Sequence, residues 1–139
     1  MSFLKNLFNP KTIRTGIIFI VEDNTAYAKT LSVFIKSTFP QITDVRIFPV
    51  GETCVTELDA RPDLIIMDYF LDSKYTDAEN GLEIKKQIRA THPEMNILLL
   101  SSQNNMEIAL KTVTIYKCSY VQKDEKAFDR VEEIIKEVV

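Results

Sequence analysis

The chain has few of the residues on which several common kinds of site depend. It contains one histidine, His92, in 139 residues. That excludes a metal site built from paired histidines, and a Ser-His-Asp triad could form only through this residue. The two cysteines, Cys54 and Cys118, form neither a CxxC motif nor a disulfide framework. We therefore expect reduced thiols and a cytoplasmic protein.

Glycine and long apolar runs are also scarce. Gly16, Gly51 and Gly81 are the only glycines, and this excludes a dinucleotide-binding fingerprint and a P-loop. No apolar run reaches the roughly 18 residues of a membrane span, so we expect no transmembrane segment. The formal net charge is -3 and no long basic stripe occurs, which argues against direct nucleic-acid binding.

What is present fits one globular domain. Hydrophobic residues make up 45% of the chain and charged residues 27%, and the length suffices for one domain with a real core. Residues 1–15 differ from the rest, because they are basic and carry no acid. We expect an N-terminal extension over 1–15, either a loosely packed terminus or a short amphipathic docking segment, and one domain over 16–139.

From Gly16 onward, apolar runs of strand length alternate with helical patterns. Asn24 is suited to cap the first helix. Five strands that alternate with helices predict an α/β domain with a doubly wound, five-stranded parallel sheet. Of the common orders for such a sheet, we expect the flavodoxin-like one, 2-1-3-4-5. The predicted strands are residues 16–21, 45–48, 63–68, 96–100 and 120–121, and the predicted helices begin at 24, 51, 82, 103 and 128.

Polar residues close the apolar runs in a regular way. Glu22 and Asp23 follow the first run, Asp68 follows the third, and Ser101 and Lys123 follow the last two. Any one of these residues could simply solvate the edge of the sheet. In the order 2-1-3-4-5, however, the first and third strands are neighbours, and the carboxyl ends of such strands meet at one crevice.

This set of side chains is suited to metal-assisted phosphoryl chemistry. Three carboxylates in one pocket repel one another, and a hard cation such as Mg2+ relieves the repulsion. An Asp carboxylate can act as a nucleophile toward phosphorus. Lys123 and Ser101 would face the oxygens of the transferred phosphoryl group, where charge must be stabilised.

The sequence resembles the receiver domain of two-component response regulators from about Gly16 to Val139. The stretches that carry the resemblance are IFIVEDN, DLIIMDYFLD, ENGLEIKKQI, ILLLSS and YVQK. It implies that Asp68 is the phosphoacceptor, that Ser101 and Lys123 assist, and that Ser101 and Tyr120 form a switch. It also implies Mg2+ ligands: Asp23, Asp68, the backbone carbonyl of Phe70, and Glu22 through water.

The resemblance carries expectations about partners and activity as well. A sensor histidine kinase or phosphotransfer protein would supply the phosphoryl group, and an unknown downstream protein would read the result. The domain would be a signalling phosphoacceptor rather than an enzyme, with self-catalysed phosphotransfer and autodephosphorylation. No output domain follows, so we expect a stand-alone, chemotaxis-type regulator, and a weak homodimer is compatible with the sequence.

Some features depart from the family pattern, and some alternatives stay open. Asp124 stands where Pro commonly follows the lysine, so we predict a trans peptide bond after Lys123. An aspartate-nucleophile hydrolase would need a second Asp where Phe70 stands. A flavodoxin-like cofactor binder would need a phosphate loop where the acids Glu22 and Asp23 stand. A receiver-like adaptor that binds a partner without phosphorylation remains the main alternative.

Overall fold

The computed structural model describes residues 16–69, 81–102 and 118–139. Within these ranges strands and helices alternate along the chain, as the sequence pattern predicts. The strands are β1 (Gly16–Val21), β2 (Ile42–Phe48), β3 (Leu64–Asp68), β4 (Ile97–Ser101) and β5 (Ser119–Gln122). The helices are α2 (Thr25–Thr38), α3 (Gly51–Val55), the short 3-10 helix η2 (Leu58–Ala60), α4 (Gly81–Thr91) and α6 (Ala127–Val138).

The five strands form one parallel sheet in the order β2-β1-β3-β4-β5. This confirms the predicted fold class and strand order. Successive strands are added on one side of β1 and then on the other, so the strand order reverses between β1 and β3. In this pair of strands, Val21 pairs with Met67. The residues that follow Val21 and Met67 therefore reach the same edge of the sheet.

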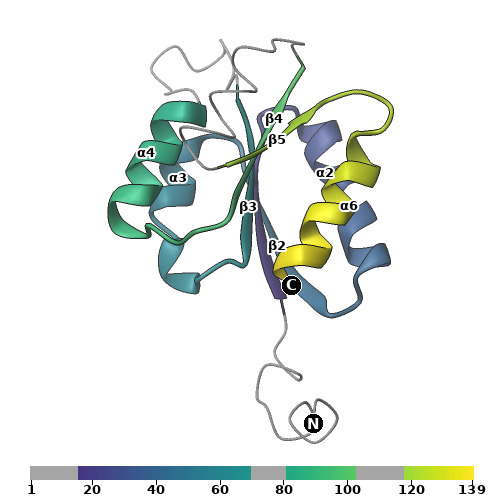
Figure 1. Ribbon diagram of the computed structural model, residues 1–139, viewed down its shortest axis with the longest axis horizontal. Coiled ribbons are helices and arrows are strands. Elements are labelled where there is room, and N and C mark those ends of the chain that lie inside the picture. Colours follow the sequence, from purple (N-terminus) through teal and green to yellow (C-terminus); the bar gives the residue numbers. More distant parts are fainter. Residues whose placement is uncertain (1–15, 70–80, 103–117) are drawn as a thin grey trace, which may run out of the picture.

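Helices cover both faces of the sheet (Figure 1). Helices α2 and α6 lie on one face, and α3 and α4 lie on the other. Side chains of β1 alternate between the two layers, because successive residues of a strand point to opposite faces. Ile18 and Ile20 join the core beneath α2 and α6, whereas Phe19 and Val21 join the core beneath α3 and α4.

Two elements differ from the prediction by more than one residue. Strand β2 begins at Ile42, three residues before the predicted start. Ile42 is buried, but the polar residues Thr43 and Asp44 follow it and interrupt the apolar pattern. The predicted helix over 51–58 is split into α3 and η2, and Arg61 adopts a left-handed conformation with φ 57° directly after η2. The helix predicted over 103–116 lies outside the described residues.

Local hydrogen bonds fix the ends of β1 and α2. The Asn24 side chain accepts a hydrogen bond from the Tyr27 backbone N–H at 3.0 Å, as predicted for an N-cap. The Asp63 carboxylate accepts from the Ile17 N–H at 2.8 Å.

The described residues contain no cis peptide bond, so the bond after Lys123 is trans, as predicted. None of the described helices is long and apolar enough to cross a membrane.

Candidate functional site

Three acidic residues meet at the carboxyl edge of β1 and β3. Glu22 and Asp23 follow β1, and Asp68 is the last residue of β3. Each offers a carboxylate oxygen, and these oxygens all lie within 4.8 Å of one another. The structure therefore brings together the three acids that the sequence analysis placed in one pocket, and the adjacency of β1 and β3 is the cause.

Lys123 lies against two of these acids. Its Nζ donates a hydrogen bond to Oε1 of Glu22 and another, at 3.1 Å, to Oδ2 of Asp68. Glu22 is 3% exposed, Asp68 7% exposed, and the Lys123 side chain 14% exposed. The other oxygen of Glu22 accepts from the Asn24 N–H at 3.1 Å. One cation thus bridges two buried carboxylates that lie far apart in the sequence.

Burial and charge act in opposite directions on this group. Burial raises the pKa of Glu22, and the hydrogen bond from Lys123 opposes that rise without cancelling it. Burial by itself lowers the pKa of Lys123, but the hydrogen bond to Glu22 and the charge of Asp68 outweigh burial and raise it. Lys123 is therefore protonated and positively charged near neutral pH, since its ordinary pKa is already well above 7.

Asp23 is the acid that Lys123 does not neutralise. Its Oδ2 is buried and has no hydrogen-bond partner in the described part of the chain. A buried polar oxygen without a partner is costly, and in native structures it often marks the place of an ion or a water molecule. All the donors here are carboxylate oxygens, which are the ligands that Mg2+ prefers. The residues present therefore fit a magnesium ion.

Ser101 and Tyr120 lie on the two strands beyond β3. Ser101 ends β4 and is 1% exposed, and the preceding residue, Leu100, pairs with Asp68. The Ser101 carbonyl accepts a hydrogen bond from the Lys123 N–H at 2.7 Å. Tyr120 is half-buried against the core beneath α3 and α4. Ser101 and Lys123 thus reach the same edge of the sheet as Asp68.

One neighbour of this group was not predicted. The ring of Tyr27 lies with its centroid 4.7 Å from Lys123 Nζ. The helical pattern places Tyr27 on the apolar face of α2, but it gives no sign of a contact with a residue 96 positions later. Phe70, whose backbone carbonyl was predicted to bind Mg2+, lies outside the described residues.

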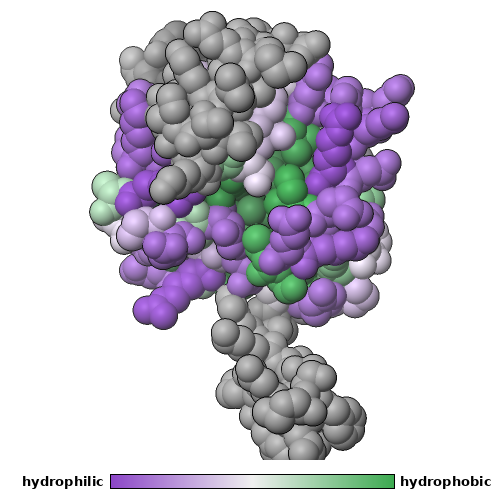
Figure 2. Space-filling model, viewed as in Figure 1, coloured by the Kyte–Doolittle hydropathy of each residue, from purple (hydrophilic) through white to green (hydrophobic). Residues whose placement is uncertain are grey.

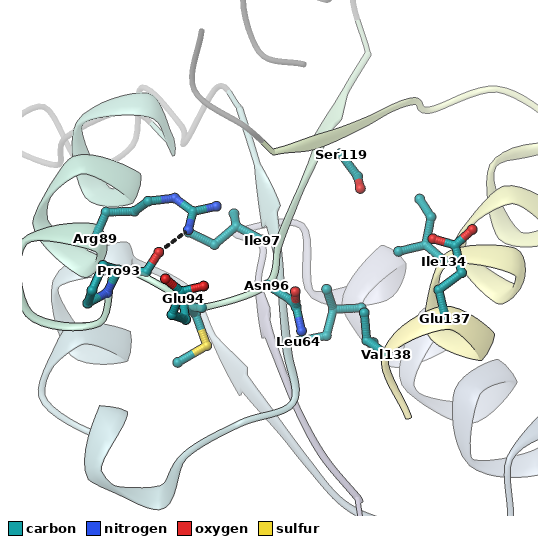
Figure 3. A pocket seen from close by; sticks show the side chains of 11 residues that line it. Leu64, Arg89, Pro93, Glu94, Asn96, Ile97, Ser119, Ile134, Glu137 and Val138 are labelled. Atoms are coloured by element: carbon teal, nitrogen blue, oxygen red, sulfur yellow. Dashed lines mark hydrogen bonds between the residues drawn. The ribbon is translucent and has the colours of Figure 1, made fainter. Parts of the chain in front are cut away.

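A separate hollow lies at the opposite end of β3 and β4 (Figure 3). It has a volume of about 400 Å³ and combines polar and apolar side chains. In it, Arg89 Nη1 donates to the Pro93 carbonyl at 2.7 Å. Figure 2 shows apolar side chains at the surface between the sheet and α6, where Ile134 lines this hollow. His92 lies nearby, and its Nδ1 is 2.8 Å from Thr91 Oγ1.

This second hollow has no acidic cluster of the kind found beside Asp68. In the described residues, the only group of acids and possible metal ligands close enough to share an ion is Glu22, Asp23 and Asp68. His92 lies near the start of β3, whereas Asp68 ends that strand, and the His92 side chain contacts the adjacent residue Thr91. We therefore place the candidate functional site at the carboxyl edge of the sheet.

Comparisons with solved structures agree on the fold. A CheY-like receiver domain protein of Methanospirillum hungatei superposes with a TM-score of 0.72 and 17% identity, over 89% of this chain and 94% of that chain. RcpA, a cyanobacterial phytochrome response regulator solved in its phosphorylated form, gives a TM-score of 0.72 and 21% identity, over 89% of this chain and 94% of its own. At these identities the likeness concerns the fold alone.

Sequence comparisons identify the family. A curated Arabidopsis thaliana protein, described as a two-component response regulator and called ARR13, is 28% identical over 110 residues. The match covers 77% of this chain but only 18% of that relative. The family model for the response regulator receiver domain matches residues 18–136. The resemblance noted in the sequence is confirmed, and the chain belongs to the response regulator receiver domain family.

Proposed function

We propose that Asp68 accepts a phosphoryl group in the presence of Mg2+, and that the phosphorylated state changes which protein the domain binds. The observation that carries this proposal is the position of the Asp68 carboxylate. It ends a buried strand, lies 3.1 Å from Lys123 Nζ, and shares a cluster with two further acids. A carboxylate held beside both a cation and a metal-binding group is suited to attack phosphorus.

The proposed reaction transfers one phosphoryl group from a donor to Asp68. A carboxylate oxygen of Asp68 forms a bond to phosphorus as the bond between phosphorus and the donor breaks, and the donor leaves with that electron pair. Negative charge on the transferring oxygens must be stabilised. Lys123 supplies a cation beside Asp68, and the Ser101 hydroxyl would donate a hydrogen bond to one of these oxygens.

Mg2+ would be held by carboxylates of Asp23 and Asp68, by the backbone carbonyl of Phe70, and by Glu22 through water. When bound, the ion neutralises charge on the phosphoryl oxygens and on the acids. The oxygen of Asp23 without a partner supports a direct role. Glu22 accepts hydrogen bonds from Lys123 and the Asn24 N–H, which supports the indirect role. Phe70 lies outside the described residues.

The proposed output is a switch through Ser101 and Tyr120. A phosphoryl group adds about -1.5 to -2 charge and strong acceptor oxygens. Ser101 would move to donate to it, and the Tyr120 ring would turn into the space that Ser101 leaves. The surface around β5 and α6 would then change, and a downstream protein would bind it. A sensor histidine kinase or phosphotransfer protein is the proposed donor.

The domain boundaries belong to the same proposal. We assign residues 16–139 to the receiver domain and residues 1–15 to an N-terminal extension. The match of the family model over residues 18–136 supports this division.

Labelling with a small phosphodonor tests the function. The intact protein is incubated with acetyl phosphate and Mg2+, and its mass is followed with time. The wild type and an Asp59→Asn control should gain one phosphoryl group, because Asp59 is exposed and lies away from the cluster. Asp68→Asn should gain none. A wild type that stays unlabelled while binding Mg2+ would favour the adaptor that works without phosphorylation.

A further inference from the structure

Two kinds of group contact the Lys123 amine: acidic side chains and an aromatic ring. On one side its Nζ donates to Glu22 and Asp68. In addition, the Tyr27 ring lies 4.7 Å from the same nitrogen. That distance is within the roughly 6 Å at which an ammonium group is attracted to the face of an aromatic ring. The contact joins α2 to the residue that directly follows β5.

The Tyr27 ring is itself fixed by its neighbours. Tyr27 lies in the first turn of α2, where its backbone N–H donates to the capping side chain of Asn24. The ring packs against Phe128 of α6 with centroids 5.8 Å apart and planes at 75°. Phe128 in turn packs against Phe34, with centroids 5.1 Å apart. The ring therefore stands on an aromatic stack that connects α2 and α6.

A fixed ring is useful because Lys123 must change partner during the reaction. Before transfer, its Nζ contacts the Asp68 carboxylate, and after transfer it must contact a phosphoryl oxygen carried by the same residue. Hydrogen bonds to the acids have to break and form again in this exchange. Attraction to the ring face is less directional, so it can persist throughout and keep the amine at the site.

We propose that Tyr27 is a positioning residue for phosphoryl transfer, which holds the Lys123 amine beside Asp68 through its aromatic ring. This inference rests on the proposed function of Asp68. The simpler reading is that Tyr27 only packs against the core, which it contacts. In that case an aliphatic side chain of similar size would serve equally well. The proposal requires an aromatic ring.

The main test compares Tyr27→Leu with Tyr27→Phe. The initial rate of labelling by acetyl phosphate is measured at saturating donor and Mg2+. We expect Tyr27→Leu to lower this rate about three- to tenfold, as expected for the loss of one partly exposed cation–π contact. Tyr27→Phe should keep a rate close to that of the wild type. Phe34→Leu is the packing control, because it disturbs the same stack two rings away from the amine.

A double mutant separates positioning from packing. If Tyr27 acts through Lys123, then Tyr27→Leu should have no further effect on the rate in a Lys123→Met background. A structural role would lower the rate by the same factor in both backgrounds. Equal factors would overturn the proposal, as would an unchanged rate in Tyr27→Leu when the wild type is labelled.

A spectroscopic measurement tests the contact without any phosphorylation. A ring that faces the amine shields the protons on Cε of Lys123, so their NMR signals should lie upfield in the wild type and in Tyr27→Phe. They should return toward the position of free lysine in Tyr27→Leu. Unshifted signals in the wild type refute the ring contact. If the shift is present and Asp68 is never labelled, the proposed function fails and Tyr27 has no reaction to assist.

Discussion

Lys123 Nζ lies 3.1 Å from Oδ2 of Asp68, although the two residues are 55 positions apart in the sequence. The parallel order of the sheet causes this proximity, because β3, β4 and β5 all end at one edge. The same lysine also contacts Glu22, and it is the only cation found in contact with the acidic cluster among the described residues. The stability of the site without metal should therefore depend on it.

Replacing Lys123 by Met should destabilise the metal-free protein by about 1–3 kcal/mol, since two buried carboxylates lose the group that pairs with them. Urea unfolding at neutral pH with a chelator present measures this difference. Lys126→Met is the matched control, because Lys126 is exposed and lies outside the cluster, and it should change stability by no more than about 0.5 kcal/mol. Equal stability of the two variants would show that the pairing contributes little.

Mg2+ should stabilise the folded protein, and Asp23 should be required for this effect. At a Mg2+ concentration one hundred times its dissociation constant, the free energy of unfolding should rise by about 2.7 kcal/mol. Asp23→Asn should abolish that rise. Without metal, the same variant should be more stable than the wild type by about 1 kcal/mol, because one of three mutually repelling charges is removed. Thermal unfolding with MgCl2 and with EDTA tests both effects.

A variant that is less stable than the wild type without metal would argue against repulsion among the three acids. A variant that still responds fully to Mg2+ would place the ion elsewhere. Glu52→Gln serves as the control, since Glu52 is exposed on α3 and is not part of the cluster.

Much of this site could be predicted from the sequence, because each strand is an apolar run that ends at a polar residue. Asp68 and Ser101 are the last residues of β3 and β4, and Glu22 follows β1 directly. Once the strand order is known, their meeting follows from the fold. The alternation of strands and helices predicted a doubly wound parallel sheet, and 2-1-3-4-5 is one of the common strand orders for such a sheet.

The contact of Tyr27 with Lys123 could not be predicted in this way. It depends on how α2 packs beside α6, and the pair is 96 positions apart in the sequence, so no local pattern encodes it. The start of β2 was missed for a different reason. β2 is an edge strand and is largely polar between Ile42 and Phe48, so its hydrophobic signal is weak.

The Cys54 thiol should make stability depend on alkaline pH. Burial, with a smaller contribution from the charge of Glu57, raises its pKa to about 12 from an ordinary value of 9.0. The folded state therefore keeps a proton that the unfolded state loses in this interval. The resulting stabilisation is complete below about pH 9 and is lost as the pH rises toward about 12.

The measurement compares wild type and Cys54→Ala by urea unfolding across this pH interval. Other groups titrate equally in both proteins, so the difference between their free energies of unfolding isolates the thiol. That difference should shrink as the pH rises. A constant difference would mean that the thiol ionises similarly in the folded and unfolded states.

Gly51 is required by the close approach of α3 to α4. A Cβ at this position would lie 2.4 Å from Cγ1 of Ile84, which is fully buried. Gly51→Ala should therefore destabilise the protein by about 1–3 kcal/mol, as overpacking does. Combining it with Ile84→Ala should cost less than the sum of the two single changes, because the second change makes room for the first. Strictly additive costs, measured by urea unfolding, would contradict this packing account.

The site of phosphorylation can be located chemically. The protein is treated with acetyl phosphate and Mg2+, the acyl phosphate is reduced with borohydride, and the modified residue is identified by peptide mass spectrometry. We expect a modification that depends on Mg2+ and lies at Asp68 alone. Modification at another carboxylate, or equal modification at Asp68 when EDTA replaces Mg2+, would contradict it.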